Sequence, residues 1–133
     1  MSSGYKPDGY SSVSPYLIVA DAGQTIAFLA QVFDAVALRR ITDPSGRVIH
    51  AEVRIDDSVL MIADAAPGWP ALDAHVHIYV PDVDATYQRA LAAGATAVQS
   101  PEQKDAADRR GGVGDGGGTT WWIATNVGSE AAL

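Results

Sequence analysis

The stretch His75-Val76-His77-Ile78-Tyr79-Val80-Pro81-Asp82 decides the fold of this chain. Three apolar residues alternate in it with two histidines and a tyrosine, and a period of two predicts a half-buried strand with one apolar and one polar, aromatic face. Pro81-Asp82 ends the strand. Apolar residues at helical spacing then predict a helix over residues 83–93, which Gly94 terminates.

An earlier segment repeats this strand and helix. Residues 16–21 have the same strand character, and the next segment predicts a helix over residues 24–33 whose buried face carries Ile26, Leu29, Ala30 and Phe33. Val19-Ala20-Asp21 aligns with Val80-Pro81-Asp82 at an offset of 61 residues, the difference between positions 80 and 19. Two copies of one unit in a short chain indicate a duplicated module.

The other segments complete two modules of the same order, strand-helix-strand-strand-strand. Strands are expected over residues 14–19, 35–42, 48–55 and 58–63, and again over 75–80, 96–99, 109–113 and 119–125, with a polar loop over 100–108. The fold class is therefore α+β: two tandem βαβββ modules form a cupped mixed sheet with helices on the outer face. We expect one structural domain made of a flexible N-terminal tail (1–12), a first module (13–64), a linker (65–73), a second module (74–127) and a C-terminal tail (128–133).

Length and composition exclude several classes of protein. The 133 residues suffice for one domain, and a hydrophobic fraction of 47% is typical of a globular protein. Without cysteine the chain has no disulfide, thiolate metal site or thiol nucleophile. A net charge of -7 argues against binding nucleic acid through its phosphates. No apolar run is long enough to span a membrane and the N-terminus shows no signal pattern, so we expect a cytoplasmic protein.

Six segments carry a resemblance to a known family. They are Ser14-Pro-Tyr-Leu-Ile-Val, Gly46-Arg-Val-Ile-His-Ala-Glu-Val-Arg-Ile, Ser58-Val-Leu-Met-Ile-Ala-Asp, Tyr79-Val-Pro-Asp-Val-Asp, Ala93-Gly-Ala-Thr and Trp121-Trp-Ile-Ala-Thr. With them the chain resembles the vicinal-oxygen-chelate superfamily of glyoxalase I, fosfomycin- and bleomycin-resistance proteins and extradiol dioxygenases, and within it the PhnB-like group. The resemblance implies the paired-module fold and a homodimer, sometimes with modules exchanged between chains. It leaves the activity open, because this fold carries lyases, transferases, dioxygenases and binding proteins.

The resemblance also implies where a metal would bind, with one ligand from the first and one from the last strand of each module. Carried over by position, these sites are Ser14, Met61, His75 and Trp122. Only His75 is a credible ligand, because serine binds metals poorly, methionine suits soft metals and tryptophan does not coordinate. We therefore expect no cofactor at the usual site, and we keep a divalent metal held by His75 with non-standard partners as an alternative.

Strand parity indicates which side chains line the cup. If the Val76 side of its strand packs under the helix, the opposite side mixes aromatic, sulfur and imidazole groups, as small-molecule pockets do. The residues expected to face inward are Tyr16, Ile18, Met61, Ala63, His75, His77, Tyr79, Thr120, Trp122 and Ala124, and those expected behind them are Leu17, Val19, Leu60, Ile62, Trp121 and Ile123. Trp122 could stack on an aromatic or cationic ligand or only fill the space of a metal, and Arg109 and Arg110 could reach an anionic ligand.

His50 and Glu52 share one face of the third strand with Arg54. One hypothesis joins His50, Glu52, His75 and His77 into a displaced metal centre. The alternative is that Glu52 pairs with Arg54 or another arginine while the histidines form local hydrogen bonds. Glu52 and His75 are also candidate catalytic acids or bases, since burial raises the pKa of a carboxyl group. The sequence shows no nucleophile with an oriented base.

Three functions agree with the sequence. The first is the binding of a small organic molecule in the cup without the usual metal, through Tyr16, His50, Met61, His77, Tyr79, Arg110 and Trp122. The second is a metal-dependent lyase, isomerase or dioxygenase with a non-standard site around His75. The third is sequestration of a cationic antibiotic of the bleomycin type, which an acidic protein attracts. As partners we expect a small molecule and a second copy of the chain, and neither nucleic acid nor a membrane.

Overall fold

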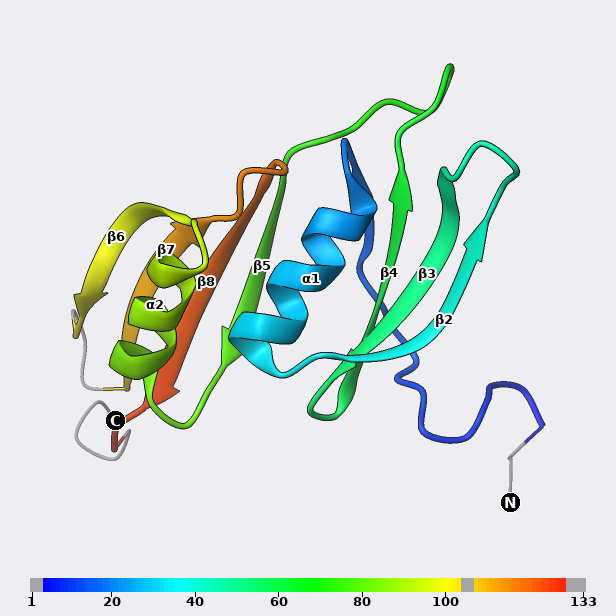
Figure 1. Cartoon of the computed structure of the whole chain (residues 1–133). Coiled ribbons are helices and arrows are strands. Elements are labelled where there is room, and N and C mark those ends of the chain that lie inside the picture. The colour runs from blue at the N-terminus through cyan, green and yellow to red at the C-terminus, as the bar shows by residue number, and fades with distance from the viewer. Residues whose placement is uncertain (1–3, 104–106, 129–133) are drawn as a thin grey trace. The chain divides into compact units, whose positions relative to one another are not determined.

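The chain consists of two compact units with the boundary between Leu72 and Asp73. The structure is a computed structural model that describes residues 4–103 and 107–128 (Figure 1). Each unit contains one helix and one four-stranded mixed sheet. The predicted α+β class and the two tandem βαβββ modules are confirmed.

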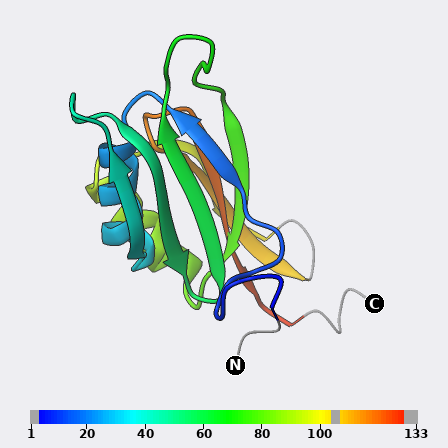
Figure 2. The same cartoon turned by 90° about the vertical axis from the view of Figure 1, so that its right-hand side faces the viewer.

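The first unit has the strand order β1-β4-β3-β2 in its sheet. Its elements are β1 (Tyr16–Val19), α1 (Ala22–Phe33), β2 (Val36–Thr42), β3 (Val48–Ile55) and β4 (Ser58–Asp64). The pair β1 and β4 is parallel, and the other two pairs are antiparallel. The helix α1 contacts β1, β3 and β4 and covers one face of the sheet (Figure 2). The opposite face is called the open face of the unit.

The second unit repeats this arrangement with the strand order β5-β8-β7-β6. Its elements are β5 (Ala74–Tyr79), α2 (Val83–Ala92), β6 (Thr96–Glu102), β7 (Asp108–Gly114) and β8 (Thr119–Asn126). Here β5 and β8 are parallel, and α2 contacts β6, β7 and β8. The six residues expected behind the pocket, Leu17, Val19, Leu60, Ile62, Trp121 and Ile123, are all buried, as a helix-covered face requires.

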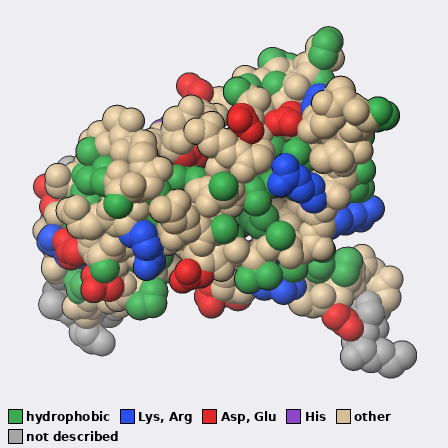
Figure 3. Space-filling view, in the orientation of Figure 1, with side chains coloured by type: hydrophobic (Ala, Val, Ile, Leu, Met, Phe, Trp, Pro, Cys, Tyr) green, Lys and Arg blue, Asp and Glu red, His purple; other side chains and the backbone are tan. Residues whose placement is uncertain are grey.

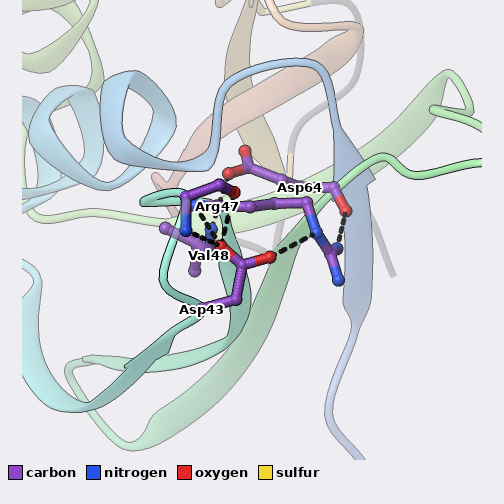
Figure 4. A network of polar contacts seen from close by, with 5 residues as sticks. Asp43, Arg47, Val48 and Asp64 are labelled. Carbon is purple, nitrogen blue, oxygen red and sulfur yellow. Dashed lines mark hydrogen bonds and ion pairs between the residues drawn. The ribbon is translucent and has the colours of Figure 1, made fainter.

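One polar side chain in the first unit connects the start of the helix to two strands. Asp64 at the end of β4 accepts hydrogen bonds from the backbone N–H of Ala22 at 2.6 Å and of Val48 at 2.8 Å. Figure 4 shows Asp64 together with Val48, Arg47 and Asp43. Ala22 is the first residue of α1, whose N–H groups have no partner within the helix. Arg47 donates to the Asp64 carbonyl at 3.4 Å and lies 3.4 Å from Asp43. The carboxylate therefore fixes α1 and β3 against the end of β4.

The internal repeat extends to these contacts. Val83, the first residue of α2, donates its N–H to Thr125 Oγ1 at 2.9 Å, and the Thr125 hydroxyl donates to the Val80 carbonyl at 2.7 Å. Positions 125 and 83 follow positions 64 and 22 by the same 61 residues. A hydroxyl in the second unit thus replaces the carboxylate of the first.

The first helix differs from its sequence-based description at both its start and its buried face. It begins at Ala22 rather than residue 24, because Asp21 caps it by accepting from the N–H of Gln24 at 3.1 Å. Ala30, expected on the buried face, is exposed, and Ile26 is only half-buried. The buried face carries Ala22, Thr25, Phe28, Leu29, Val32 and Phe33. The buried face follows positions 22, 25, 29 and 32, and residue 30 lies outside this spacing.

The polar loop predicted over residues 100–108 is also shorter than expected. Strand β6 continues to Glu102, which pairs with Arg110, and β7 begins at Asp108. Pro101 does not interrupt β6, because this strand is at the edge of the sheet, where a residue without an N–H is tolerated. Residues 104–106 of the remaining loop lie outside the described residues.

On the face that Figure 3 shows, acidic and basic side chains are interspersed rather than gathered into separate patches. Among residues 4–103 and 107–128, no helix is long and apolar enough to cross a membrane.

We predict that Asp64→Ala lowers the free energy of unfolding by about 2–6 kcal/mol, because two buried N–H groups lose their acceptor at about 1–3 kcal/mol each. Asp64→Asn should cost less, since its amide oxygen still accepts one bond. Asp57→Ala, at an exposed turn, is the control and should change stability by less than about 0.5 kcal/mol. Urea denaturation followed by circular dichroism measures all three, and equal values for Asp64→Ala and Asp57→Ala would contradict the assignment.

Candidate functional site

Strand pairing brings three of the expected site residues together on the open face of the first unit. Tyr16 on β1 pairs with Met61 on β4, and Met61 pairs with Glu52 on β3. Paired residues point to the same side of a sheet. His50 lies two residues before Glu52 on β3 and therefore shares this side.

Four side chains form a continuous hydrogen-bond chain on this face, called the Tyr16 chain. The Tyr10 hydroxyl donates to Glu52 Oε1 at 2.5 Å, and Glu52 Oε2 lies 2.8 Å from His50 Nε2. The other ring nitrogen, His50 Nδ1, lies 3.0 Å from the Tyr16 hydroxyl. The Tyr16 and His50 rings also make an edge contact, with centroids 5.5 Å apart and planes at 65°. The partners of Glu52 are thus Tyr10 and His50, whereas Arg54 donates to the Gly9 carbonyl at 3.1 Å.

Burial and hydrogen bonding determine the charge of Glu52. Glu52 is buried, with 6% of the surface of the whole residue exposed. The hydroxyl of Tyr10, and after it the ring of His50, hold the pKa of Glu52 below its usual value, against the opposing effect of burial. The same bond raises the pKa of the Tyr10 phenol. An ionised carboxylate only accepts, so the hydrogen-bond network assigns the His50 proton to Nε2 and leaves Nδ1 to accept from Tyr16.

A cavity lies next to the Tyr16 end of this chain. Its volume is about 370 Å³, and its lining is Tyr16, Arg47, Ile49, Ala63, Asp64, Ala66 and Trp69. Trp69 is held by a short turn, in which Ala66 and Trp69 exchange backbone hydrogen bonds of 2.9 and 2.7 Å. The cavity therefore combines a flat aromatic side chain, a guanidinium group and a tyrosine hydroxyl that is bonded to an imidazole.

A second cluster, called the Trp122 cluster, lies on the open face of the second unit. Trp122 Nε1 donates to His75 Nδ1 at 3.0 Å, and the two rings are nearly parallel at 12° with centroids 6.2 Å apart. The guanidinium carbon of Arg110 lies 5.4 Å from the centre of the Trp122 ring, within cation–π distance. Trp122 is half-buried, so part of its ring is accessible.

A glycine opposite Trp122 makes room for the indole. Gly112 pairs with Trp122 across β7 and β8, and a Cβ added to Gly112 would lie 2.6 Å from Trp122 Cζ3. Two carbon atoms that are not bonded to each other do not approach this closely, so any other residue at 112 would displace the ring. Close contact with a neighbouring group is a recognised reason for glycine inside a strand.

The remaining candidates lie beside this cluster, because His77 pairs with Trp122 across β5 and β8. The His77 and Tyr79 rings meet at an angle of 66° with centroids 4.8 Å apart, and the Tyr79 hydroxyl donates to Asp108 at 2.8 Å. Arg109 does not accompany Arg110: it forms two hydrogen bonds of 2.8 Å with Asp84 on α2, which lower the pKa of that carboxyl. Only Arg110 of the two arginines adjoins the Trp122 cluster.

Sequence reasoning missed four residues of these sites, namely Tyr10, Arg47, Trp69 and Gly112. Tyr10 lies in a segment without periodicity, which was expected to be a tail. The sequence also gave no sign of a hydroxyl beside an oriented base, because Tyr16 and His50 are 34 residues apart. The register of β1, β4 and β3 brings them together. Gly112 alone had a signal, since a glycine within a strand indicates close backbone approach.

The chemistry of the family metal positions does not fit a divalent metal. A hydroxyl, a thioether and an indole stand at positions 14, 61 and 122, and His75 uses Nδ1 to accept from Trp122. Within the described part of each unit, no three His, Cys, Asp or Glu side chains gather so as to hold a metal ion.

Comparison with known proteins places this arrangement in a family. A model of the glyoxalase/bleomycin resistance protein/dioxygenase superfamily matches residues 11–123. The chain belongs to this superfamily. An uncharacterized protein of Mycobacterium bovis is 40% identical over 130 residues, which cover 87% of this chain and 84% of the relative. One of Mycobacterium tuberculosis shows the same identity over 75% of its length. The resemblance seen in the sequence is confirmed for the superfamily, and the PhnB-like group stays a prediction.

Solved structures of the superfamily share the fold. TioX from Micromonospora sp. ML1 is 26% identical, with a TM-score of 0.72 over 88% of this chain and 99% of that chain. FosX, a fosfomycin resistance protein from Listeria monocytogenes, is 18% identical, with a TM-score of 0.69 over 88% and 94%. TnmS3, an antibiotic binding protein from Streptomyces sp. CB03234, is also 18% identical, with a TM-score of 0.66 over 89% and 100%. At 18% identity these likenesses show the fold alone.

We predict that Tyr10→Phe lowers the free energy of unfolding by about 1–2 kcal/mol at neutral pH, because the buried Glu52 carboxylate loses a donor. The Tyr10 bond lowers the Glu52 pKa, so the stability it supplies is complete above the ordinary value of 4.5 and is lost as the pH falls through the folded value. The difference from wild type should therefore shrink below about pH 4.5. Tyr5→Phe, at an exposed tyrosine, is the control, and a difference independent of pH would contradict the assignment.

We predict that Gly112→Ala displaces the Trp122 indole and breaks its bond to His75, at a cost of about 1–3 kcal/mol for overpacking. Gly114→Ala is the matched control on the same strand, since its Cβ would only meet Val98 at 4.0 Å. Urea denaturation gives the stabilities, and tryptophan fluorescence reports the changed surroundings of the indole. Equal effects of the two substitutions would show that Trp122 does not occupy the space over Gly112.

Proposed function

We propose that the protein binds a small organic molecule with a planar aromatic part, neutral or anionic, on the Trp122 cluster, without a metal at the family position. The observation that carries the proposal is the fixed orientation of the Trp122 indole. Its N–H donates a hydrogen bond to His75. The ring lies over Gly112, in space that a side chain at position 112 would occupy. A ring held in advance loses little conformational freedom when a ligand stacks on it.

The charge beside the ring determines the kind of ligand. Arg110 already lies 5.4 Å from the ring centre, where a cationic ligand would have to approach. A like charge at this distance disfavours a cation and favours a carboxylate, a phenolate or a neutral ring. The cationic antibiotic of the third hypothesis is therefore disfavoured at this cluster, although the net charge of -7 attracts cations in general.

The superfamily supports binding as a function. The fold of this chain is also the fold of TnmS3, an antibiotic binding protein. A fold shared at 18% identity does not transfer a ligand, so the ligand class is argued from the cluster itself. A metal-dependent lyase, isomerase or dioxygenase is the less favoured alternative, because three of the four family positions carry side chains unsuited to a divalent metal.

The proposal is tested by calorimetric titration with 2-naphthoate, 2-naphthol and bleomycin, which are anionic, neutral and cationic. We expect the first two to bind and Trp122→Leu to weaken both by about tenfold, the equivalent of a stacking energy of about 1.4 kcal/mol. Arg110→Gln should weaken 2-naphthoate more than 2-naphthol. Trp69→Leu, a tryptophan in the other unit, is the control and should leave the affinities unchanged.

Two outcomes would overturn the proposal. Wild-type affinity in Trp122→Leu would remove the indole from the site. Binding of bleomycin alone would replace the proposed ligand class with a cationic drug. A melting-temperature shift with one divalent metal that is lost in His75→Ala would instead support the metal-dependent enzyme, because a ligand of the folded state raises its stability.

We also propose that the chain forms a homodimer. Edge strands expose apolar side chains in both units, namely Val36 and Ile41 on β2 and Val98 on β6. Such edges are open to pairing with a second chain. Light scattering after gel filtration tests the mass, and a monomer at all concentrations would refute it. The cytoplasmic location stays a prediction from the sequence.

A further inference from the structure

The Tyr16 chain has the arrangement of an activated nucleophile, and it belongs to the first unit, whereas the Trp122 cluster belongs to the second. We propose that Tyr16 is a catalytic nucleophile that accepts the acyl group of a small activated carbonyl compound, such as an ester or thioester, with His50 as its base. Glu52 is a positioning residue, since it acts through His50. The inference goes beyond the proposed binding function and does not depend on it.

The base is oriented by a buried group. Glu52 is 6% exposed and accepts a hydrogen bond from His50 Nε2, which turns Nδ1 toward the Tyr16 hydroxyl at 3.0 Å. Tyr10 fixes the carboxylate from the other side at 2.5 Å. A hydroxyl within hydrogen-bond distance of a base, which a third group orients in turn, is the general signature of nucleophilic catalysis. If Tyr16 only packed on the sheet, Glu52 and His50 would not need to be aligned with its hydroxyl.

Exposure increases along the chain from Glu52 to Tyr16. The side chain of Glu52 is 8% exposed, that of His50 is 22% exposed, and Tyr16 as a residue is 48% exposed. The buried end therefore holds the carboxylate, and the accessible end is Tyr16, a residue that lines the cavity of about 370 Å³. A phenol, with an ordinary pKa of about 10, is also easier for an imidazole to deprotonate than an alcohol is.

The cavity supplies a cation for the oxygen that becomes charged in such a reaction. Arg47 lines the cavity together with Tyr16, and its guanidinium group lies 3.4 Å from both the Asp43 carboxylate and the Asp64 carbonyl, which are long contacts. The Asp64 carboxylate in the same lining is engaged by the N–H groups of Ala22 and Val48 and does not compete with His50 as a base. The charged or titratable groups around the chain are Tyr10, Arg39, Glu52 and Arg54 on one side and Asp43, Arg47 and Asp64 on the cavity side.

Tyr16, His50, Glu52 and Arg47 account for every bond and proton in the acyl transfer. Tyr16 Oη adds to the carbonyl carbon while its proton moves to His50 Nδ1, and the Glu52 carboxylate stabilises the imidazolium. The guanidinium of Arg47 stabilises the oxyanion of the tetrahedral intermediate. When the intermediate collapses, the bond to the leaving group breaks, and the leaving group takes the proton from His50. The acyl group remains on Tyr16 as a phenyl ester, which water hydrolyses by the reverse proton path.

The test is acetylation of the full chain by p-nitrophenyl acetate, with release of p-nitrophenolate followed by absorbance and the acetyl group located by peptide mass spectrometry. We expect Tyr16 to react about a hundredfold faster than Tyr5, because general-base assistance is worth about 10²–10⁴-fold. Tyr5 is the internal control, as a tyrosine with 77% of its surface exposed.

Variants separate catalysis from a structural role. Tyr16→Phe should abolish the rapid phase, and His50→Gln should reduce the reaction to the rate of an ordinary tyrosine. Glu52→Gln should slow the acetylation of Tyr16 relative to Tyr5 in the folded variant, because the imidazolium that forms loses its carboxylate. Tyr5→Phe should leave the rapid phase unchanged.

Each outcome decides the proposal. Equal acetylation of Tyr16 and Tyr5 in wild type overturns it, as does an unchanged rate in a folded His50→Gln variant. Circular dichroism and the melting temperature establish folding of each variant. If His50→Gln does not fold, the ratio of Tyr16 to Tyr5 acetylation in wild type and in Glu52→Gln decides instead.

Discussion

The hydrogen bonds of the Asp64 carboxylate are the constraint on which the first unit depends. A carboxylate at the end of β4 satisfies the N–H at the start of α1 and the N–H at the start of β3, two groups that the helix and the sheet leave without partners. This fixes the end of β4 relative to the helix, and the parallel register of β1 and β4 then sets Tyr16 beside Met61. In the second unit Thr125 holds the equivalent N–H with a hydroxyl.

The two units use one backbone plan for different chemistry. Met61 pairs with Glu52 in the first unit, and Trp122 at the equivalent position pairs with Gly112 in the second. By the same registers Arg110 corresponds to His50. Arg110 precedes Gly111, the partner of Ile123, and His50 precedes Ala51, the partner of Ile62. The small residue paired with Trp122 leaves space for a flat indole, whereas the carboxylate of the residue paired with Met61 orients an imidazole. One unit therefore presents a surface for stacking and the other a polarised hydroxyl.

Most of the fold followed from hydrophobic periodicity and the internal repeat. The order of strands and helices along the chain and the buried side of the sheets were predictable, because periods of 2 and 3.6 residues are local properties of the chain. The errors lay at element ends. Asp21 started α1 two residues early by capping it, and the edge position of β6 allowed the strand to continue through Pro101. Both depend on neighbours that a local pattern does not contain.

The sequence by itself determined the superfamily fold, the face of each strand and the unsuitability of positions 14, 61 and 122 for a divalent metal, since residue type and parity suffice for these. Only the tertiary structure decided which polar groups are partners. Glu52 bonds to Tyr10 and His50 rather than Arg54, Tyr16 meets an imidazole, and Trp122 lies over Gly112. Those contacts join residues that are distant in sequence, and the registers of strand pairing, which no local pattern encodes, bring them together.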